Sequence, residues 1–403
     1  MTNEVNTLQV LLGDRRVGML LRLPDDGITF AFDPTYSNDP DRPTLSLGFK
    51  MPGGRLFRQP KTQTRLPPYF ANLLPEGALR DYLARKLGVK AVRDFPLIAA
   101  LGGDLPGNVR VQADSAGPLH DALPIAQATG SRPLKFSLAG VQLKFSALES
   151  AAGGLSIPIT GEGGDWIVKL PSSTFPNLPA HEMTMLELAR SIGIPVPEVR
   201  LVSMDTIAGM PGDIPWQERE ALAVCRFDRQ DGRRIHTEDF AQVFRQYPED
   251  KYNGASSQSL GRVLLAESGV GEVMELVKRL VFTVLIGNAD MHLKNWSLIY
   301  EDGRRPKLSP AYDYVSTVIY MIDNELGLSL GGTKVIRDIG LDHFARFADK
   351  VGVPSRAVSD LVHGTVADFK MEWRNSSLVR QLPEQQAERL EAHFHSLTLW
   401  RAG

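Results

Sequence analysis

The 403-residue sequence has almost no cysteine, no excess of one charge and no long apolar run. Its one cysteine, Cys225, cannot form an internal disulfide, so we expect a fold held by its own hydrophobic core in a reducing compartment. A formal net charge of −2 gives no general attraction to nucleic acid or anionic membranes. No apolar stretch is long enough to span a bilayer, and the N-terminus lacks the pattern of a secretion signal. These absences favour a cytoplasmic protein with no membrane partner.

The length allows two or three domains, each with its own core. Residues 1–112 are predicted to form a small α/β domain, because three strand-like segments precede a helical pattern around Tyr82. Residues 113–132 are rich in Ala, Pro, Gly and Asp and read as a linker. Residues 133–403 then begin with strands and become mostly helical. We therefore predict an α+β chain in which residues 133–225 form a β-rich lobe and residues 226–403 a helical lobe.

The beginning of the β-rich lobe has a pattern suited to binding phosphates. Two strand candidates flank a tight loop at Gly140, and the loop and the strand after it supply Val141, Gln142 and Lys144 as candidate nucleotide contacts. A single glycine is a weak signal, and an ordinary hairpin has the same pattern. The phosphate-binding interpretation gains support because this pattern precedes the predicted strand that carries Lys169.

Lys169 and Glu182 form the next predicted pair. Kinases present a strand lysine to the α- and β-phosphates of ATP and hold it with a helix glutamate. Here Lys169 is the one lysine of a predicted strand that begins at Trp166, and Glu182 lies near the start of a predicted helix. A solvated edge lysine and a carboxylate placed by the helix dipole are the simpler explanations. A later strand ends at Cys225, and the chain leaves it through Phe227, where kinases have the hinge that holds adenine.

Asp290, Asn295 and Asp313 carry the strongest pattern. In the kinase template the base Asp precedes a magnesium-binding Asn by five positions, and a second metal-binding Asp follows downstream. Asp290 and Asn295 are five apart, and a predicted hairpin between them and Asp313 returns the chain to the same place. Both Asn295 and Asp313 offer the oxygen ligands that Mg²⁺ prefers.

Two further residues of this segment have competing explanations. His292 lies beside Asp290, but no Cys or second His stands at the spacing of a zinc site. Lys294 either neutralises phosphate or is simply solvated. Asp290 itself would also suit a turn. Because loop, strand lysine, helix glutamate, hinge, base and metal ligands occur in kinase order, the set favours phosphoryl transfer, with His292 and Lys294 as candidate nucleotide contacts.

These motifs together resemble the HipA family, the serine/threonine kinase toxins of bacterial toxin–antitoxin modules. The resemblance covers most of the chain, and the order of the motifs is more specific than any one of them. It rests on the segments Ala99–Gly107, Phe136–Lys144, Ile167–Pro171, Cys225–Arg229, Asp290–Asn295 and Pro310–Asp313.

The resemblance implies a two-lobed kinase domain after a small N-terminal domain, with ATP and Mg²⁺ as cofactors. It implies that Asp290 is the catalytic base, that Asn295 and Asp313 hold magnesium and that Lys169 contacts the ATP phosphates. Ser137 matches the position where family members autophosphorylate and switch off. A phosphoserine there would be repelled by the ATP phosphates.

The resemblance also implies partners. These are a helix-turn-helix antitoxin of the HipB type, operator DNA bound through that complex, and a protein substrate such as an aminoacyl-tRNA synthetase. The chain departs from the family in two places: Cys225 stands where an acidic residue is frequent, and His181 where Asn is frequent. The first puts the adenine contact in doubt, and the second the cap of the helix.

Two other functions remain open from the sequence. A small-molecule or lipid kinase also uses an Asp-x-His-x-x-Asn pattern in a related fold. A non-catalytic corepressor that acts beside the antitoxin would need no base, and the complete set of Lys169, Asp290, Asn295 and Asp313 argues against it.

Overall fold

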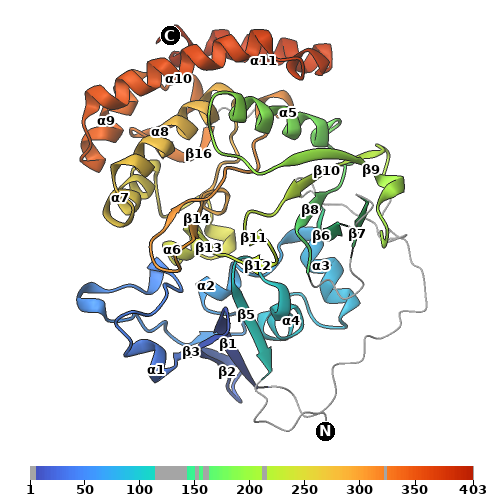
Figure 1. Cartoon of the computed structure of the whole chain (residues 1–403), viewed down its shortest axis with the longest axis vertical. Coiled ribbons are helices and arrows are strands. Elements are labelled where there is room, and N and C mark those ends of the chain that lie inside the picture. Colours follow the sequence, from blue (N-terminus) through green and yellow to red (C-terminus); the bar gives the residue numbers. More distant parts are fainter. Residues whose placement is uncertain are drawn as a thin grey trace.

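The structure is a computed structural model. It describes residues 6–113, 143–149, 154–157, 163–210, 216–321 and 325–402. Figure 1 shows the N-terminal domain at one end of the molecule and the last helices at the other. Four predicted site residues, Ser137, Gly140, Val141 and Gln142, lie outside the described residues, as does the predicted linker except Ala113.

The N-terminal domain is built on an antiparallel sheet with the strand order β4-β3-β2-β1-β5. The side chains of Val10, Val17 and Leu20 are completely buried on its inner face, as strand alternation predicts. Three of its strands match the sequence prediction. The strands are β1 (Thr7–Leu12), β2 (Arg15–Arg22), β3 (Gly27–Phe32), β4 (Thr62–Gln63) and β5 (Val109–Ala113).

Short helices cover the inner face of this sheet. Tyr69 and Phe70 of α2 join the core that also contains Phe30 and Phe49. Tyr82 lies on the buried side of the predicted helix around it. The helices are α1 (Pro34–Ser37), α2 (Pro68–Ala71), α3 (Gly77–Lys86) and α4 (Asp94–Leu101).

The β-rich lobe contains a second antiparallel sheet, in the order β7-β6-β8-β10-β9. Val168 and Ala223 are fully buried in its core. Helix α5 (Leu178–Ser191) packs against β10 and β9 and ends before Gly193, whose φ of 77° stops the helix. The strands are β6 (Lys144–Glu149), β7 (Leu155–Ser156), β8 (Trp166–Lys169), β9 (Val199–Ser203) and β10 (Glu220–Cys225).

The helical lobe has one large core. Helix α8 runs through it and buries Val277, Val281 and Val284 on one apolar face. The helices are α6 (Phe240–Val243), α7 (Ser257–Glu267), α8 (Val270–Leu285), α9 (Leu341–Val351), α10 (Ser355–Asn375) and α11 (Glu384–Ser396). None of the helices in the described ranges combines the length and the apolar character needed to cross a membrane.

This lobe also contains strands. The predicted hairpin before Asp313 is present, because β14 pairs with β15, and β13 adds a third strand to it. The strands are β11 (Arg229–Gln230), β12 (Arg233–Arg234), β13 (His236–Asp239), β14 (Ser297–Tyr300), β15 (Lys307–Leu308), β16 (Glu325–Leu330) and β17 (Thr333–Val335).

The N-terminal domain is joined to the helical lobe by buried polar contacts. The carboxylate of Asp104 accepts a hydrogen bond from Arg229 at 2.7 Å, and the amide of Gly107 donates to Asp228 at 2.7 Å. At a second contact the Leu47 amide donates to Glu238 at 2.9 Å. Because these partners are buried and paired, the domain belongs to the same packed body as the helical lobe.

Candidate active site

Lys169 lies at the centre of the site and is 7% exposed. Its ammonium donates hydrogen bonds to the carboxylates of Glu182 and Asp313. The predicted contact between Lys169 and Glu182 is therefore confirmed. The three side chains come from β8, from α5 and from the segment after β15, so both lobes contribute to one buried charge cluster.

The pKa values of this cluster favour one cation beside two acids. Burial would lower the pKa of Lys169, but the facing carboxylates outweigh burial and raise it. Burial acts against the charge of Asp313 as well, yet Lys169 holds the pKa of that carboxyl well below its usual range. Burial raises the pKa of Glu182. Lys169 and Asp313 are thus ionised at neutral pH.

Asp313 stands on a backbone that is fixed from several sides. Its φ is 56°, a left-handed conformation that L-residues seldom adopt. The side-chain amide of Asn288 donates to the Asp313 carbonyl at 3.2 Å, and the hydroxyl of the preceding Tyr312 donates to the Lys294 carbonyl at 2.8 Å. These bonds bring the end of the hairpin back to the loop after α8.

In the loop after α8, the backbone of Asp290 is held by hydrogen bonds to the side chains of Asn288 and Asn295. The Asp290 amide donates to Asn288 at 3.0 Å, and the side-chain amide of Asn295 donates to the Asp290 carbonyl at 2.9 Å. Asn288 is 1% exposed and links this loop to Asp313. The link from Asn288 to Asp313 spans 25 residues, so no local pattern of the sequence marks it.

Asp290 and His292 are both affected by burial. Burial raises the pKa of Asp290, and a hydrogen bond donated by the Tyr252 hydroxyl opposes that rise. Burial, together with Lys251, lowers the pKa of His292 to about 3. His292 is therefore neutral at physiological pH, and its ring adds no charge next to Asp290.

The chemistry of the remaining donors fits a magnesium ion. The amide nitrogen of Asn295 is used by the Asp290 carbonyl, which leaves the amide oxygen as the atom for a ligand. Asp313 adds an ionised carboxylate. No cluster of three or more His, Cys, Asp or Glu side chains in the described ranges is arranged to hold a metal. An ion here would complete its shell with phosphate oxygens and water, as Mg²⁺ commonly does.

Three other predicted nucleotide contacts, Lys144, Phe227 and Cys225, lie at different places relative to Lys169 and Asp313. Lys144 is exposed on β6 directly opposite Lys169, and its charge lowers the pKa of Asp313. Phe227 lies with its ring 5.8 Å from that of Tyr312, which precedes Asp313. Cys225 ends β10 and is half-buried. Lys144 and Phe227 therefore lie beside the charged cluster, whereas Cys225 pairs with Trp166 and lies three residues along β10 from Leu222, the partner of Lys169.

Lys294 is placed differently. Its ammonium donates to the carbonyl of Asn72 at 2.9 Å and lies 3.2 Å from Glu76 and 3.4 Å from Asp239. Both Asn72 and Glu76 belong to the N-terminal domain. The structure therefore engages Lys294 in domain packing and does not bring its ammonium together with Lys169.

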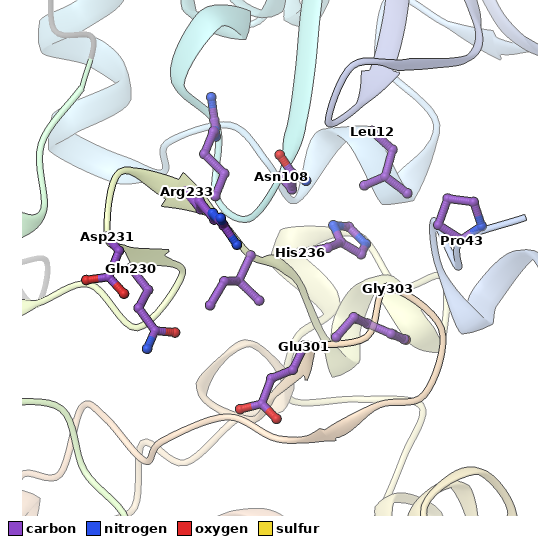
Figure 2. A pocket seen from close by; sticks show the side chains of 12 residues that line it. Leu12, Pro43, Asn108, Gln230, Asp231, Arg233, His236, Glu301 and Gly303 are labelled. Carbon is purple, nitrogen blue, oxygen red and sulfur yellow. The ribbon is translucent and has the colours of Figure 1, made fainter.

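A separate cavity of about 670 Å³ lies between the N-terminal domain and the helical lobe (Figure 2). Asn108, Arg233, His236 and Glu301 are among its lining residues, and Lys169, Asp290 and Asp313 are not. His236 donates through Nε2 to the Leu45 carbonyl at 2.8 Å in the neutral form that its pKa, lowered by burial to about 4, implies. The cavity is a feature of the domain junction and is distinct from the charged cluster.

Comparisons with known proteins follow the same division of the chain. The family model described as HipA N-terminal domain matches residues 8–112, and the HipA-like C-terminal domain matches residues 136–373. A Sinorhizobium fredii protein named "Putative kinase Y4dM" is 42% identical over 99% of this chain and 98% of its own. The "Serine/threonine-protein kinase toxin HipA" of Shewanella oneidensis is 26% identical over 88% of this chain and 85% of its own.

One solved structure has the same fold over nearly the whole chain. It is the complex of Shewanella oneidensis HipA with HipB and operator DNA, and its matching chain shares 22% sequence identity. The TM-score is 0.74, with 98% of this chain and 96% of that chain covered. The two-lobed kinase-like fold with an N-terminal domain, predicted from the sequence, is confirmed.

Proposed function

The chain belongs to the HipA family, and from that premise we propose that it is an ATP- and magnesium-dependent serine/threonine protein kinase and the toxin of a toxin–antitoxin module. The observation that carries this proposal is the position of Lys169 between Glu182 and Asp313, with Asp290 on the facing loop. Phosphoryl transfer demands mainly positioning and charge neutralisation, and this cluster offers both.

Each residue of the cluster has a role in the proposal. Lys169, held by Glu182, neutralises the ATP phosphates. Asp290 accepts the proton of the acceptor hydroxyl as that oxygen attacks the γ-phosphorus and ADP leaves. Its raised pKa supports this role, because a base works best when its pKa approaches the working pH.

Asn295 and Asp313 would hold the magnesium ion. The ion neutralises the charge on the phosphates when it is bound. Asp313 keeps an ionised oxygen in place for it through its bond with Lys169, and Asn295 is fixed by its bond to the Asp290 carbonyl. His292 is proposed to border the nucleotide as a neutral ring, and Lys294 to fix this loop on the N-terminal domain.

The proposal assigns the loop before β6 to the phosphates. Gly140, Val141 and Gln142 are proposed as contacts of these phosphates, and Lys144 lies on β6 directly opposite Lys169. Ser137 is the proposed autophosphorylation site. Cys225 and Phe227 would border the adenine, since they stand where the chain leaves the β-rich lobe.

The proposed partners are a HipB-type antitoxin and, through it, operator DNA. The support is the fold shared with the HipA chain of a complex that contains both. The proposed substrate is a protein of translation, such as an aminoacyl-tRNA synthetase, modified in the cytoplasm. The name of the Shewanella oneidensis relative supports the toxin role.

Mapping the product of ATP treatment tests the proposal. The purified chain is incubated with magnesium and ATP, its intact mass is measured, and any phosphate is located by peptide mass spectrometry. We expect one phosphate on Ser137 in the wild type and none in Asp290→Asn. Asp302→Asn is the matched control, because Asp302 only binds backbone amides in the exposed β14–β15 turn.

Other outcomes select the rival functions. ATP consumption on addition of a lipid or sugar, with an unmodified chain, would favour the small-molecule kinase. ATP binding without turnover, combined with antitoxin-dependent retention on operator DNA, would favour the corepressor. Phosphate on Asp290→Asn at the wild-type level would contradict the assignment of the base.

A further inference from the structure

Tyr252 contacts the candidate site, although no motif or spacing in the sequence marks it. Its hydroxyl donates a hydrogen bond to Oδ1 of Asp290, and its ring meets that of His292 edge-on, with centroids 5.1 Å apart and planes at 86°. The residue is 38% exposed. Tyr252 therefore contacts both Asp290 and His292 while part of the residue remains accessible to solvent.

The backbone around Tyr252 is held on two sides. The Leu293 amide donates to the Lys251 carbonyl at 3.0 Å, and the Lys334 ammonium donates to the Tyr252 carbonyl at 3.5 Å. Lys251 also lies 3.4 Å from Glu76 of the N-terminal domain. The main chain here is thus tied to the loop after α8 and to β17, while the Lys251 side chain reaches the N-terminal domain. A gate at this position would therefore move the tyrosine side chain and leave the backbone in place.

The contact with Asp290 is the one a kinase base makes with its acceptor. In the kinase template the base receives the hydrogen bond of the hydroxyl that will be phosphorylated. Here an internal hydroxyl already occupies that position. A carboxylate left open beside ATP would bind water, and water activated there would hydrolyse ATP without a product.

We propose, on the basis of the function proposed above, that Tyr252 is a positioning residue that gates the acceptor site. Its hydroxyl holds the acceptor position on Asp290 and excludes water until an acceptor hydroxyl replaces it. The exchange conserves one hydrogen bond to the carboxylate, so displacement of the tyrosine by the acceptor costs little free energy. Tyr252 is 38% exposed, so its movement would not require the buried core to open.

The test is ATP hydrolysis by Tyr252→Phe with no added acceptor, with Ser137→Ala present in every protein compared because Ser137 is itself a proposed acceptor. The substitution keeps the ring against His292 and removes the hydroxyl, which leaves a space of about one water molecule next to Asp290. We expect ADP release to rise about tenfold, because a charge-assisted hydrogen bond no longer competes with water. The affinity for ATP and the melting temperature should not change.

Two further variants separate gating from a general structural effect. Tyr247→Phe is the matched control, because Tyr247 lies five residues earlier and packs under the Arg65 guanidinium. This variant should hydrolyse ATP at the wild-type rate. In Tyr252→Phe combined with Asp290→Asn the additional hydrolysis should disappear, since the water would have lost its base. Tyr252→Ala should show the rise as well.

Several results would overturn the gate. Hydrolysis by Tyr252→Phe at or below the wild-type rate means that the hydroxyl does not exclude water, and phosphate mapped to Tyr252 means that it is an acceptor. If the wild type transfers phosphate while Tyr252→Phe shows no rise, the gate fails and the kinase function stands. If no variant forms ADP although ATP binds, the proposed function fails and the gate fails with it.

Discussion

Lys169 is the residue at which the two lobes depend on each other. It is buried with two carboxylates, and neither carboxylate has a second cation at hydrogen-bond distance among the described residues. Removal of one member of a buried ion pair is far more harmful than loss of a surface pair. The stability of the site and its proposed chemistry therefore rest on the same ammonium.

Lys169→Met should lower the free energy of unfolding by about 3–5 kcal/mol, because it leaves Glu182 and Asp313 buried without their cation. Urea denaturation at neutral pH measures this. Lys144→Met is the control, since Lys144 is exposed opposite Lys169 and should change the unfolding free energy little. Equal losses in both variants would show that the buried cluster is not what stabilises the lobes.

Glu238 should make stability depend on pH. Burial raises its pKa to about 7, although bonds from Ser46, Tyr300 and Leu47 oppose the rise. A folded-state pKa above the unfolded value stabilises the fold below the unfolded pKa, and that stability is lost as pH rises through about 7. For Glu238 alone the difference is about 3 kcal/mol, at about 1.4 kcal/mol per pKa unit.

The measurement is urea denaturation of wild type and Glu238→Gln at pH 5 and pH 8. The neutral amide should be the more stable of the two at pH 8, and its advantage should shrink as pH falls toward 5. A difference between the two proteins that is the same at both pH values would mean that Glu238 does not titrate in this range.

Among the elements, the segment between α4 and β5 joins the N-terminal domain to the proposed hinge. The Gly107 amide donates to Asp228, and its carbonyl accepts from Arg229 at 3.0 Å and from Arg234 at 3.1 Å. Gly107 has a φ of 71°. A side chain there would be strained and would also meet the backbone of β13.

Gly107→Ala should destabilise the protein more than a positive φ alone explains. An added Cβ would lie 2.7 Å from the Thr237 amide nitrogen, whereas at Gly88, with a φ of 66°, it would meet nothing within 4 Å. We expect Gly88→Ala to cost about 1 kcal/mol and Gly107→Ala about 1–3 kcal/mol more. Thermal unfolding compares them, and equal melting temperatures would contradict the close packing of this segment on β13.

For the whole molecule, the sequence predicted the parts that follow from order along the chain. We could predict the strand with Lys169, the helix with Glu182, their contact and the later hairpin. A kinase site needs these residue types in this order along the chain. Asp313 was predicted to return to the Asp290 loop because a hairpin brings its ends together.

The contacts that were missed join segments with no pattern of their own. Tyr252 lies in an exposed turn 38 residues before Asp290, and neither periodicity nor spacing marks it. Lys294 binds Asn72 across 222 residues, so its role in domain packing depends on how the domains meet. Asp104 binds Arg229 across 125 residues for the same reason. Periodicity and spacing describe neighbours along the chain, and these pairs exist only after the domains pack.

The central claim is that this assembled site transfers the γ-phosphate of ATP with Asp290 as the base. Its most direct test is the single-turnover rate of phosphate transfer at saturating ATP, measured for wild type and Asp290→Asn beside their ATP dissociation constants. We expect a rate at least about 100-fold lower in the variant, which is the usual contribution of a general base, with ATP affinity unchanged. Transfer by Asp290→Asn at the wild-type rate would contradict it.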